Sequence, residues 1–130
     1  MPAAARLRSV VLDCPEPRDL ARFYAGVAGG TPEEQDPDWV VLQVPGGPRL
    51  AFQRAQGYRP PQWPRADQDS QQFHLDFDAG STWEEVDAAE EKVLALGARV
   101  LDREDDEKKD FRVYADPAGH PFCLCRIEHP

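Results

Sequence analysis

The segment Phe111–Arg126 has the sequence FRVYADPAGHPFCLCR, which predicts a strand, a tight turn and a second strand. A second segment, Trp39–Arg54, lies 72 positions earlier and reads WVVLQVPGGPRLAFQR. The two align without a gap: Pro45 coincides with Pro117, and apolar residues match on both sides of the turn. We therefore expect the chain to consist of two copies of one structural unit.

Composition limits the classes of partner. The net charge of the 130 residues is −9, which argues against a nucleic-acid backbone as partner because phosphate binding needs a basic surface. No apolar run approaches the roughly 20 residues of a membrane span, and the N-terminus lacks the apolar core of a signal peptide. The odd number of cysteines, three, favours reduced thiols. We expect a cytoplasmic protein with no nucleic-acid or membrane partner.

Apolar periodicity and turn residues predict the other elements. In the first copy we expect a strand at Ser9–Cys14, a helix at Arg18–Ala28, a short acidic connection at Thr31–Asp38 with room for a brief edge strand, and a hairpin of Trp39–Val44 and Arg49–Arg54. In the second copy we expect a strand at Gln72–Asp78, a helix that starts with the capping box at Thr82 and ends at Gly97, a strand at Ala98–Leu101 and the hairpin at Phe111–Arg126. The mixed-charge run Asp102–Asp110 is expected to be a solvated loop.

These elements indicate an α+β fold in which two βαβββ modules form a curved mixed sheet with helices on the outer face and a concave cup on the other. We expect one domain over residues 1–130, with module one at about 8–54, a linker at 55–70 and module two at about 71–128. The linker is long for a structureless segment and carries three prolines, so a lid over a site is the alternative to a plain connection. Tyr58 and Trp63 keep the lid interpretation open.

Strand alternation predicts which side chains line the open face of the sheet. In the strand Gln72–Asp78 the apolar residues Phe73, Leu75 and Phe77 are expected to face the helices. The residues expected on the open face are small or polar: Ser9, Asp13, Ala51, Gln53, His74, Asp76, Cys123 and Cys125. A face lined in this way suits a small ligand or a metal ion.

Each candidate site residue also has a structural explanation. His74 is a candidate general base, metal ligand or hydrogen-bonding partner, or a histidine satisfied by Asp76, which would orient it. Cys123 is a candidate thiolate ligand or nucleophile, or a small apolar residue in the core. Gln53 is a candidate polar anchor, and Trp63 is a candidate stacking surface or packing residue.

Five segments carry a family resemblance: VVLDCPEPRDLARFYAGVAGG, LAFQR, QFHLDF, LALGARVL and VYADPAGHPFCLC. Together they resemble the glyoxalase-like subgroup of the vicinal oxygen chelate superfamily, which includes glyoxalase I, extradiol dioxygenases and bleomycin-resistance proteins. The resemblance implies two βαβββ modules around a shared cup, and a homodimer. In metal-using members it implies four ligands from the first and last strand of each module. In this chain those positions are occupied by Ser9, Ala51, His74 and Cys123.

Two functions from different classes follow from this ligand pattern. Ala51 cannot bind a metal and Ser9 is a poor ligand, which favours a bleomycin-resistance-like protein that binds a small molecule without the full standard metal triad. His74 and Cys123 could still hold a divalent metal, with Gln53 or Asp76 as a third ligand. The alternative is therefore a metal-dependent enzyme of the lyase, isomerase or dioxygenase type that uses His74.

Overall fold

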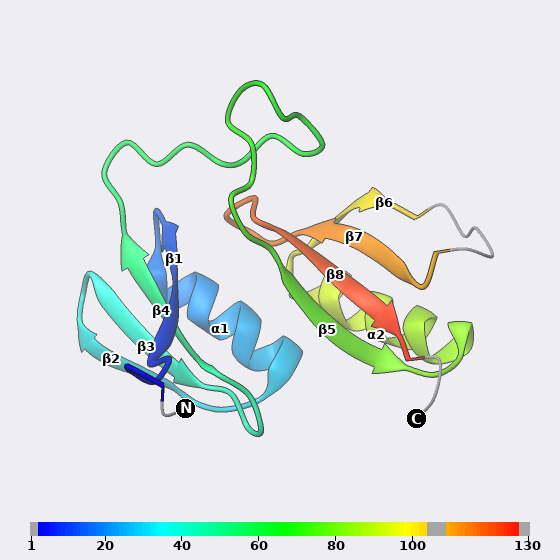
Figure 1. Cartoon of the computed structure of the whole chain (residues 1–130), viewed down its shortest axis with the longest axis horizontal. Coiled ribbons are helices and arrows are strands. Elements are labelled where there is room, and N and C mark those ends of the chain that lie inside the picture. Colours follow the sequence, from blue (N-terminus) through cyan, green and yellow to red (C-terminus); the bar gives the residue numbers. More distant parts are fainter. Residues whose placement is uncertain (1–2, 104–108, 128–130) are drawn as a thin grey trace. The chain divides into compact units, whose positions relative to one another are not determined.

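The chain forms two compact units, residues 1–58 and 59–130, each with its own helix and four-stranded sheet (Figure 1). The computed structural model describes residues 3–103 and 109–127. The boundary between the units falls inside the segment expected to connect the two copies. The α+β class and the two βαβββ modules are confirmed.

Unit one follows the predicted order of elements. They are β1 (Ser9–Cys14), α1 (Pro17–Ala28), β2 (Pro32–Asp36), β3 (Trp39–Gln43) and β4 (Arg49–Arg54). The sheet order is β1-β4-β3-β2, with β1 parallel to β4 and the other pairs antiparallel. The brief acidic edge strand thus exists as β2, at the edge of the sheet.

Helix α1 begins at Pro17, which suits a first helical position because its missing N–H would lack an intrahelical partner there. Its apolar face, including Leu20, Phe23 and Tyr24, is buried. The Tyr24 ring stacks with that of Phe52 on β4, with ring centroids 5.9 Å apart. This contact fixes the helix against one face of its sheet.

Unit two repeats the plan. Its elements are β5 (Leu75–Gly80), α2 (Trp83–Leu96), β6 (Arg99–Asp102), β7 (Phe111–Ala115) and β8 (Pro121–Arg126). The sheet order is β5-β8-β7-β6, with β5 parallel to β8. Of the predicted Asp102–Asp110 loop, residues 104–108 lie outside the described residues. Asp102 ends β6 and pairs with Lys109 at 2.8 Å.

The capping box of α2 forms as predicted. The Thr82 hydroxyl accepts a hydrogen bond from the Glu85 amide at 3.1 Å, and Gly97 ends the helix in the left-handed conformation. Between α2 and the sheet lies a polar contact that the apolar pattern did not indicate. Buried Arg112 pairs with Asp87 at 2.9 Å.

The duplication extends to individual polar contacts. Arg54 at the end of β4 pairs with Asp38 at 2.7 Å, and Arg126 at the end of β8 pairs with Asp110 at 2.6 Å. Both pairs are related by the same shift of 72 positions as the hairpins. The amide of each arginine also donates to the carbonyl of the same aspartate. The two modules therefore close their hairpins in the same way.

The start of β5 corrects one prediction. The strand begins at Leu75 rather than Gln72, and Phe73, expected in the core, is 87% exposed. The reason lies in the pairing: among the described residues β5 is an edge strand with β8 as its partner, and its first paired residue is Leu75, opposite Phe122. Phe73 precedes this pairing, so alternation does not apply to it.

Ala51, which was expected on the open face, is fully buried. Its strand β4 is an inner strand between β1 and β3, and Phe52 beside it is buried as well, so both faces of β4 are covered at this point. The three cysteines are free thiols. Within the described residues, no helix combines the length and apolar character needed to cross a membrane.

Candidate functional site

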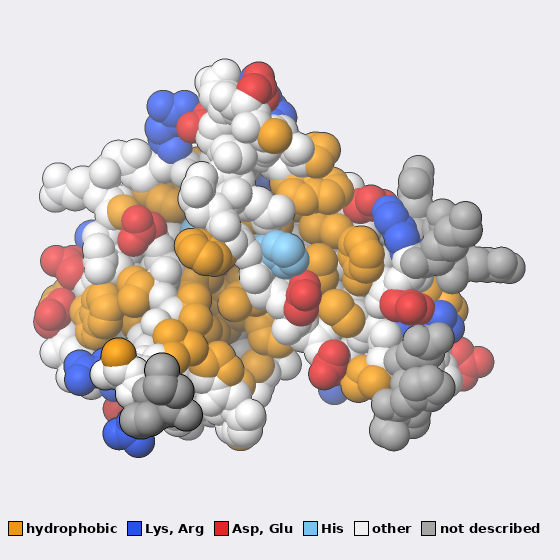
Figure 2. Space-filling view, in the orientation of Figure 1, with side chains coloured by type: hydrophobic (Ala, Val, Ile, Leu, Met, Phe, Trp, Pro, Cys, Tyr) orange, Lys and Arg blue, Asp and Glu red, His pale blue; other side chains and the backbone are white. Residues whose placement is uncertain are grey.

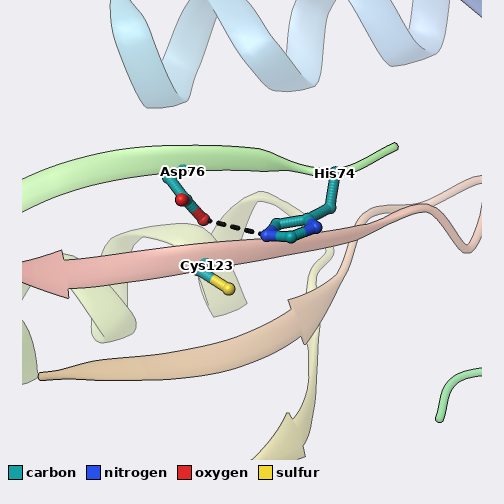
Figure 3. A group of neighbouring side chains, drawn as sticks. All are labelled: His74, Asp76 and Cys123. Atoms are coloured by element: carbon teal, nitrogen blue, oxygen red, sulfur yellow. Dashed lines mark ion pairs between the residues drawn. The ribbon is translucent and has the colours of Figure 1, made fainter. Parts of the chain in front are cut away.

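A cluster of metal-ligating side chains lies in unit two and consists of His74, Asp76 and Cys123. Their donor atoms all lie within 4.8 Å of one another. His74 immediately precedes β5, Asp76 lies on β5, and Cys123 lies on the neighbouring strand β8. Figure 3 shows the imidazole turned toward Asp76, with the thiol close by. The sequence placed these three residues on one face, and the structure brings them together.

The His74–Asp76 pair forms the exposed part of this cluster. His74 Nε2 lies 3.2 Å from Asp76 Oδ1, and the two side chains are 42% and 61% exposed. A carboxylate beside one ring nitrogen fixes the orientation of the imidazole. Histidine and acidic side chains reach the surface on the face drawn in Figure 2. The pair is thus accessible to a ligand from solvent.

Cys123 forms the buried part of the cluster. It pairs with Asp76 in the parallel register of β5 and β8 and is 6% exposed. Burial raises the pKa of the Cys123 thiol to about 12, and the nearby Asp76 carboxylate adds to this effect. At neutral pH the group is therefore a thiol that can donate a hydrogen bond. A thiol is a weak nucleophile, so the structure argues against nucleophilic catalysis by free Cys123.

A second cysteine and carboxylate stand next along the same strands. Cys125 pairs with Asp78 in the register, as Cys123 does with Asp76. The pKa of Cys125 is raised to about 11 by burial and by the nearby carboxylates of Asp76 and Asp78. This face of the β5–β8 pair therefore carries two thiols and two carboxylates.

Among its described residues, unit one has no equivalent cluster. Val10 pairs with Leu50 as Leu75 pairs with Phe122, so Ser9 and Ala51 occupy the positions of His74 and Cys123. Ala51 has no donor atom. The Ser9 hydroxyl oxygen is buried and has no hydrogen-bond partner among the described residues.

The other predicted site residues lie on other elements of the chain. Gln53 is exposed on β4 of unit one, opposite Asp13. Trp63 lies in the segment before β5, is half-buried and is joined to Pro64 by a cis peptide bond. His120, a further histidine, lies between the β7–β8 turn and the start of β8.

Sequence reasoning missed the residue that organises this turn. Asp116 is buried, and its Oδ1 accepts hydrogen bonds from the amides of Ala118 at 2.8 Å and His120 at 3.0 Å. An aspartate directly before the proline of a tight turn is a recognisable signal for this arrangement. By holding the turn, Asp116 sets the start of β8 and hence the position of Cys123.

Comparison with known families identifies one match. The family model of the glyoxalase-like domain matches residues 9–125. Among curated proteins, no sequence matches the chain.

Solved structures share the fold at low sequence identity. A glyoxalase/bleomycin resistance protein/dioxygenase family enzyme from Burkholderia phytofirmans PsJN is 20% identical, with a TM-score of 0.73, over 95% of this chain and 99% of that one. A glyoxalase-related enzyme from Fulvimarina pelagi is 21% identical, with a TM-score of 0.70, over 94% and 88%. A mutant of the fosfomycin resistance protein FosX from Listeria monocytogenes, complexed with Mn(II) and a dihydroxypropylphosphonic acid, is 15% identical, with a TM-score of 0.68, over 95% and 90%.

Proposed function

The chain belongs to the glyoxalase-like domain family, and from that premise we propose that it binds a small oxygen-bearing molecule without the full standard metal triad. The binding face is the side of the β5–β8 pair that carries His74, Asp76 and Cys123. We further propose that the protein is a cytoplasmic homodimer, in line with its free thiols and with the family resemblance.

The observation that carries this proposal is the asymmetry between the modules. The resemblance implies metal ligands from both modules, but unit one has Ser9 and Ala51 where unit two has His74 and Cys123. The Ala51 side chain offers no ligand atom. A site that draws two ligands from each module therefore cannot be completed in this chain.

The cluster can bind oxygen atoms by hydrogen bonding. His74 is exposed and supplies a ring nitrogen, which Asp76 orients. Cys123 supplies a thiol donor beneath it. Asp76 and Asp78 place negative charge on the same face, so neutral or cationic ligands are favoured over anions.

A metal-dependent enzyme of the lyase, isomerase or dioxygenase type is the second candidate. It is favoured by the convergence of imidazole, carboxylate and thiol donors within 4.8 Å. One structural relative, FosX, is complexed with Mn(II). In such an enzyme His74 would act as ligand or base.

A ligand screen by thermal shift separates the two candidates. Protein treated with EDTA and then freed of it is screened against small oxygenated compounds, with His74→Gln as the test variant and His120→Gln as the matched control. Stabilisation in wild type and His120→Gln that is lost in His74→Gln supports metal-free binding. If compounds stabilise the protein only after a divalent metal is restored, the second candidate replaces the first.

A further inference from the structure

We propose that module two alone forms a zinc site from His74 Nε2, a carboxylate oxygen of Asp76 and Cys123 Sγ. The site needs no residue of module one. It rests on the second candidate of the proposed function, because it uses the same three residues on the β5–β8 face, and its test is independent of any organic ligand.

The distances already approach those of a zinc site. Zinc bonds of about 2.0–2.3 Å in tetrahedral geometry put neighbouring ligand atoms roughly 3.3–3.8 Å apart. The His74 Nε2–Asp76 Oδ1 separation is 3.2 Å. All three donors lie within 4.8 Å of one another, so the remaining closure is about 1 Å. The exposed His74 and Asp76 side chains can make that movement by small rotations.

The strands set this convergence. Asp76 and Cys123 are partners in the β5–β8 register, so their side chains project to the same face. His74 precedes Asp76 by two positions and turns its ring toward the Asp76 carboxylate (Figure 3). Asp78, two positions further along β5, adds negative charge that attracts a cation without joining the cluster.

The donor types select the metal. A thiolate, an imidazole and a carboxylate together suit zinc, whereas Mg²⁺ and Mn²⁺ prefer oxygen ligands. Three protein ligands leave one coordination position for water or an oxygen of a bound molecule. Zinc displaces the thiol proton of Cys123, which passes to buffer, so binding releases about one proton per site.

The test uses full-length protein stripped of metal. Zinc is added in isothermal titration calorimetry at neutral pH, and Co²⁺ is added separately as a spectroscopic probe. We expect one zinc per chain and a thiolate-to-cobalt charge-transfer band. His74→Gln, Asp76→Asn and Cys123→Ser should each weaken zinc binding at least tenfold, and Cys123→Ser should abolish the band.

Two matched controls lie on the same face. Cys125→Ser removes the neighbouring thiol and Asp78→Asn removes the neighbouring carboxylate, and both variants should keep the stoichiometry and the cobalt band. Cys123 is buried, so His74→Gln and Asp76→Asn, which alter exposed side chains, carry the test if Cys123→Ser does not fold.

Three results would overturn the proposal. They are absence of zinc binding by wild type, loss of the cobalt band in Cys125→Ser but not in Cys123→Ser, and one zinc per two chains. None of these results bears on the metal-free ligand screen, so failure of the zinc site and failure of the proposed function are told apart.

Discussion

Residues of the candidate site owe their properties to different causes. His74 is 42% exposed and lies one position before Leu75, the first residue of β5 that pairs with β8. Cys123 is held in place because it lies on β8, an inner strand between β5 and β7. In the proposed site the exposed residue can adjust to a ligand, while the buried residue keeps a fixed position.

The buried thiol makes stability depend on alkaline pH. The pKa of Cys123 is raised from 9.0 to about 12 in the folded chain, mainly by burial. Above about pH 9 the unfolded chain loses this proton and the folded chain keeps it, so the free energy of unfolding falls as pH rises toward 12. Between about pH 8 and pH 10, Cys123 should lower the free energy of unfolding by an amount on the order of 1 kcal/mol. Urea unfolding of wild type and Cys123→Ala at both pH values measures it, and an equally steep fall in the variant would contradict the prediction.

Two glycines allow a second prediction at the residue scale. Gly30 has φ +93°, and a Cβ there would lie 2.5 Å from the Gln43 carbonyl oxygen. Gly46 has φ +73° but open space around it, so it serves as the matched control. Gly46→Ala should lower the free energy of unfolding by about 1 kcal/mol through backbone strain alone. Gly30→Ala should lower it by about 2–4 kcal/mol, because the clash with the carbonyl oxygen adds to the strain. Chemical denaturation compares the two variants, and equal losses of unfolding free energy would show that the Gln43 carbonyl moves aside freely.

Among the elements, the two helices start differently although the modules are copies. Glu16 precedes α1 and makes no capping hydrogen bond with its side chain, whereas Thr82 caps α2. Instead, Glu16 pairs with Arg54 at 2.8 Å. In unit two the matching Arg126 lies over the Trp83 ring, 4.9 Å from its centroid. The arginine at the end of the last strand thus contacts the start of the helix in both modules, by different means.

The cap of α2 gives a prediction for this element. Thr82→Ala removes the acceptor of the Glu85 amide and should lower the free energy of unfolding by about 1 kcal/mol. Thr82→Ser keeps a hydroxyl at the same place and should change stability by only a few tenths of that amount. Urea denaturation of the three proteins is the measurement. Matching losses in both variants would assign the effect to the threonine methyl group rather than to the cap.

Local patterns in the sequence predicted which helices and strands exist better than they predicted where each one begins and ends. The repeat of 72 positions located both hairpins, because turn prolines and glycines leave a local signal. The start of β5 could not be read locally, since it depends on where β8 offers a partner. The burial of Ala51 could not be read locally either, because alternation describes one covered face and β4 is covered on both at that residue.

The candidate site was predictable only in part. Alternation put His74, Asp76 and Cys123 on one face, but their convergence needs the parallel β5–β8 register, which joins residues far apart in the sequence. The raised pKa of Cys123 also follows from burial in the folded sheet, which no local pattern encodes. The role of Asp116 depends on the amides of its own turn and was recognisable from the Asp-Pro pair.

At the scale of the whole molecule, residues 55–70 are either a plain connection between the modules or a lid over a site. This segment contains a small turn of its own, in which the Arg65 amide donates to the Gln62 carbonyl at 2.9 Å. The Arg65 guanidinium pairs with Asp67 at 3.0 Å, yet both side chains are exposed. An exposed turn of this kind is a preferred site of proteolysis.

We expect limited trypsin digestion to cut early at the exposed Arg65–Ala66 bond, giving fragments 1–65 and 66–130. Arg59 is followed by Pro60, which trypsin does not cleave, and Arg18 and Arg22 lie in helix α1, where the backbone resists a protease. Mass spectrometry identifies the fragments. Arg65→Gln should remove the cut, and Arg18→Gln should leave it unchanged.

A linker predicts the same cleavage rate with and without a compound that stabilises the protein in the ligand screen, whereas a lid predicts slower cleavage when that compound is bound. Early cleavage within α1 with Arg65–Ala66 intact would contradict the expected order.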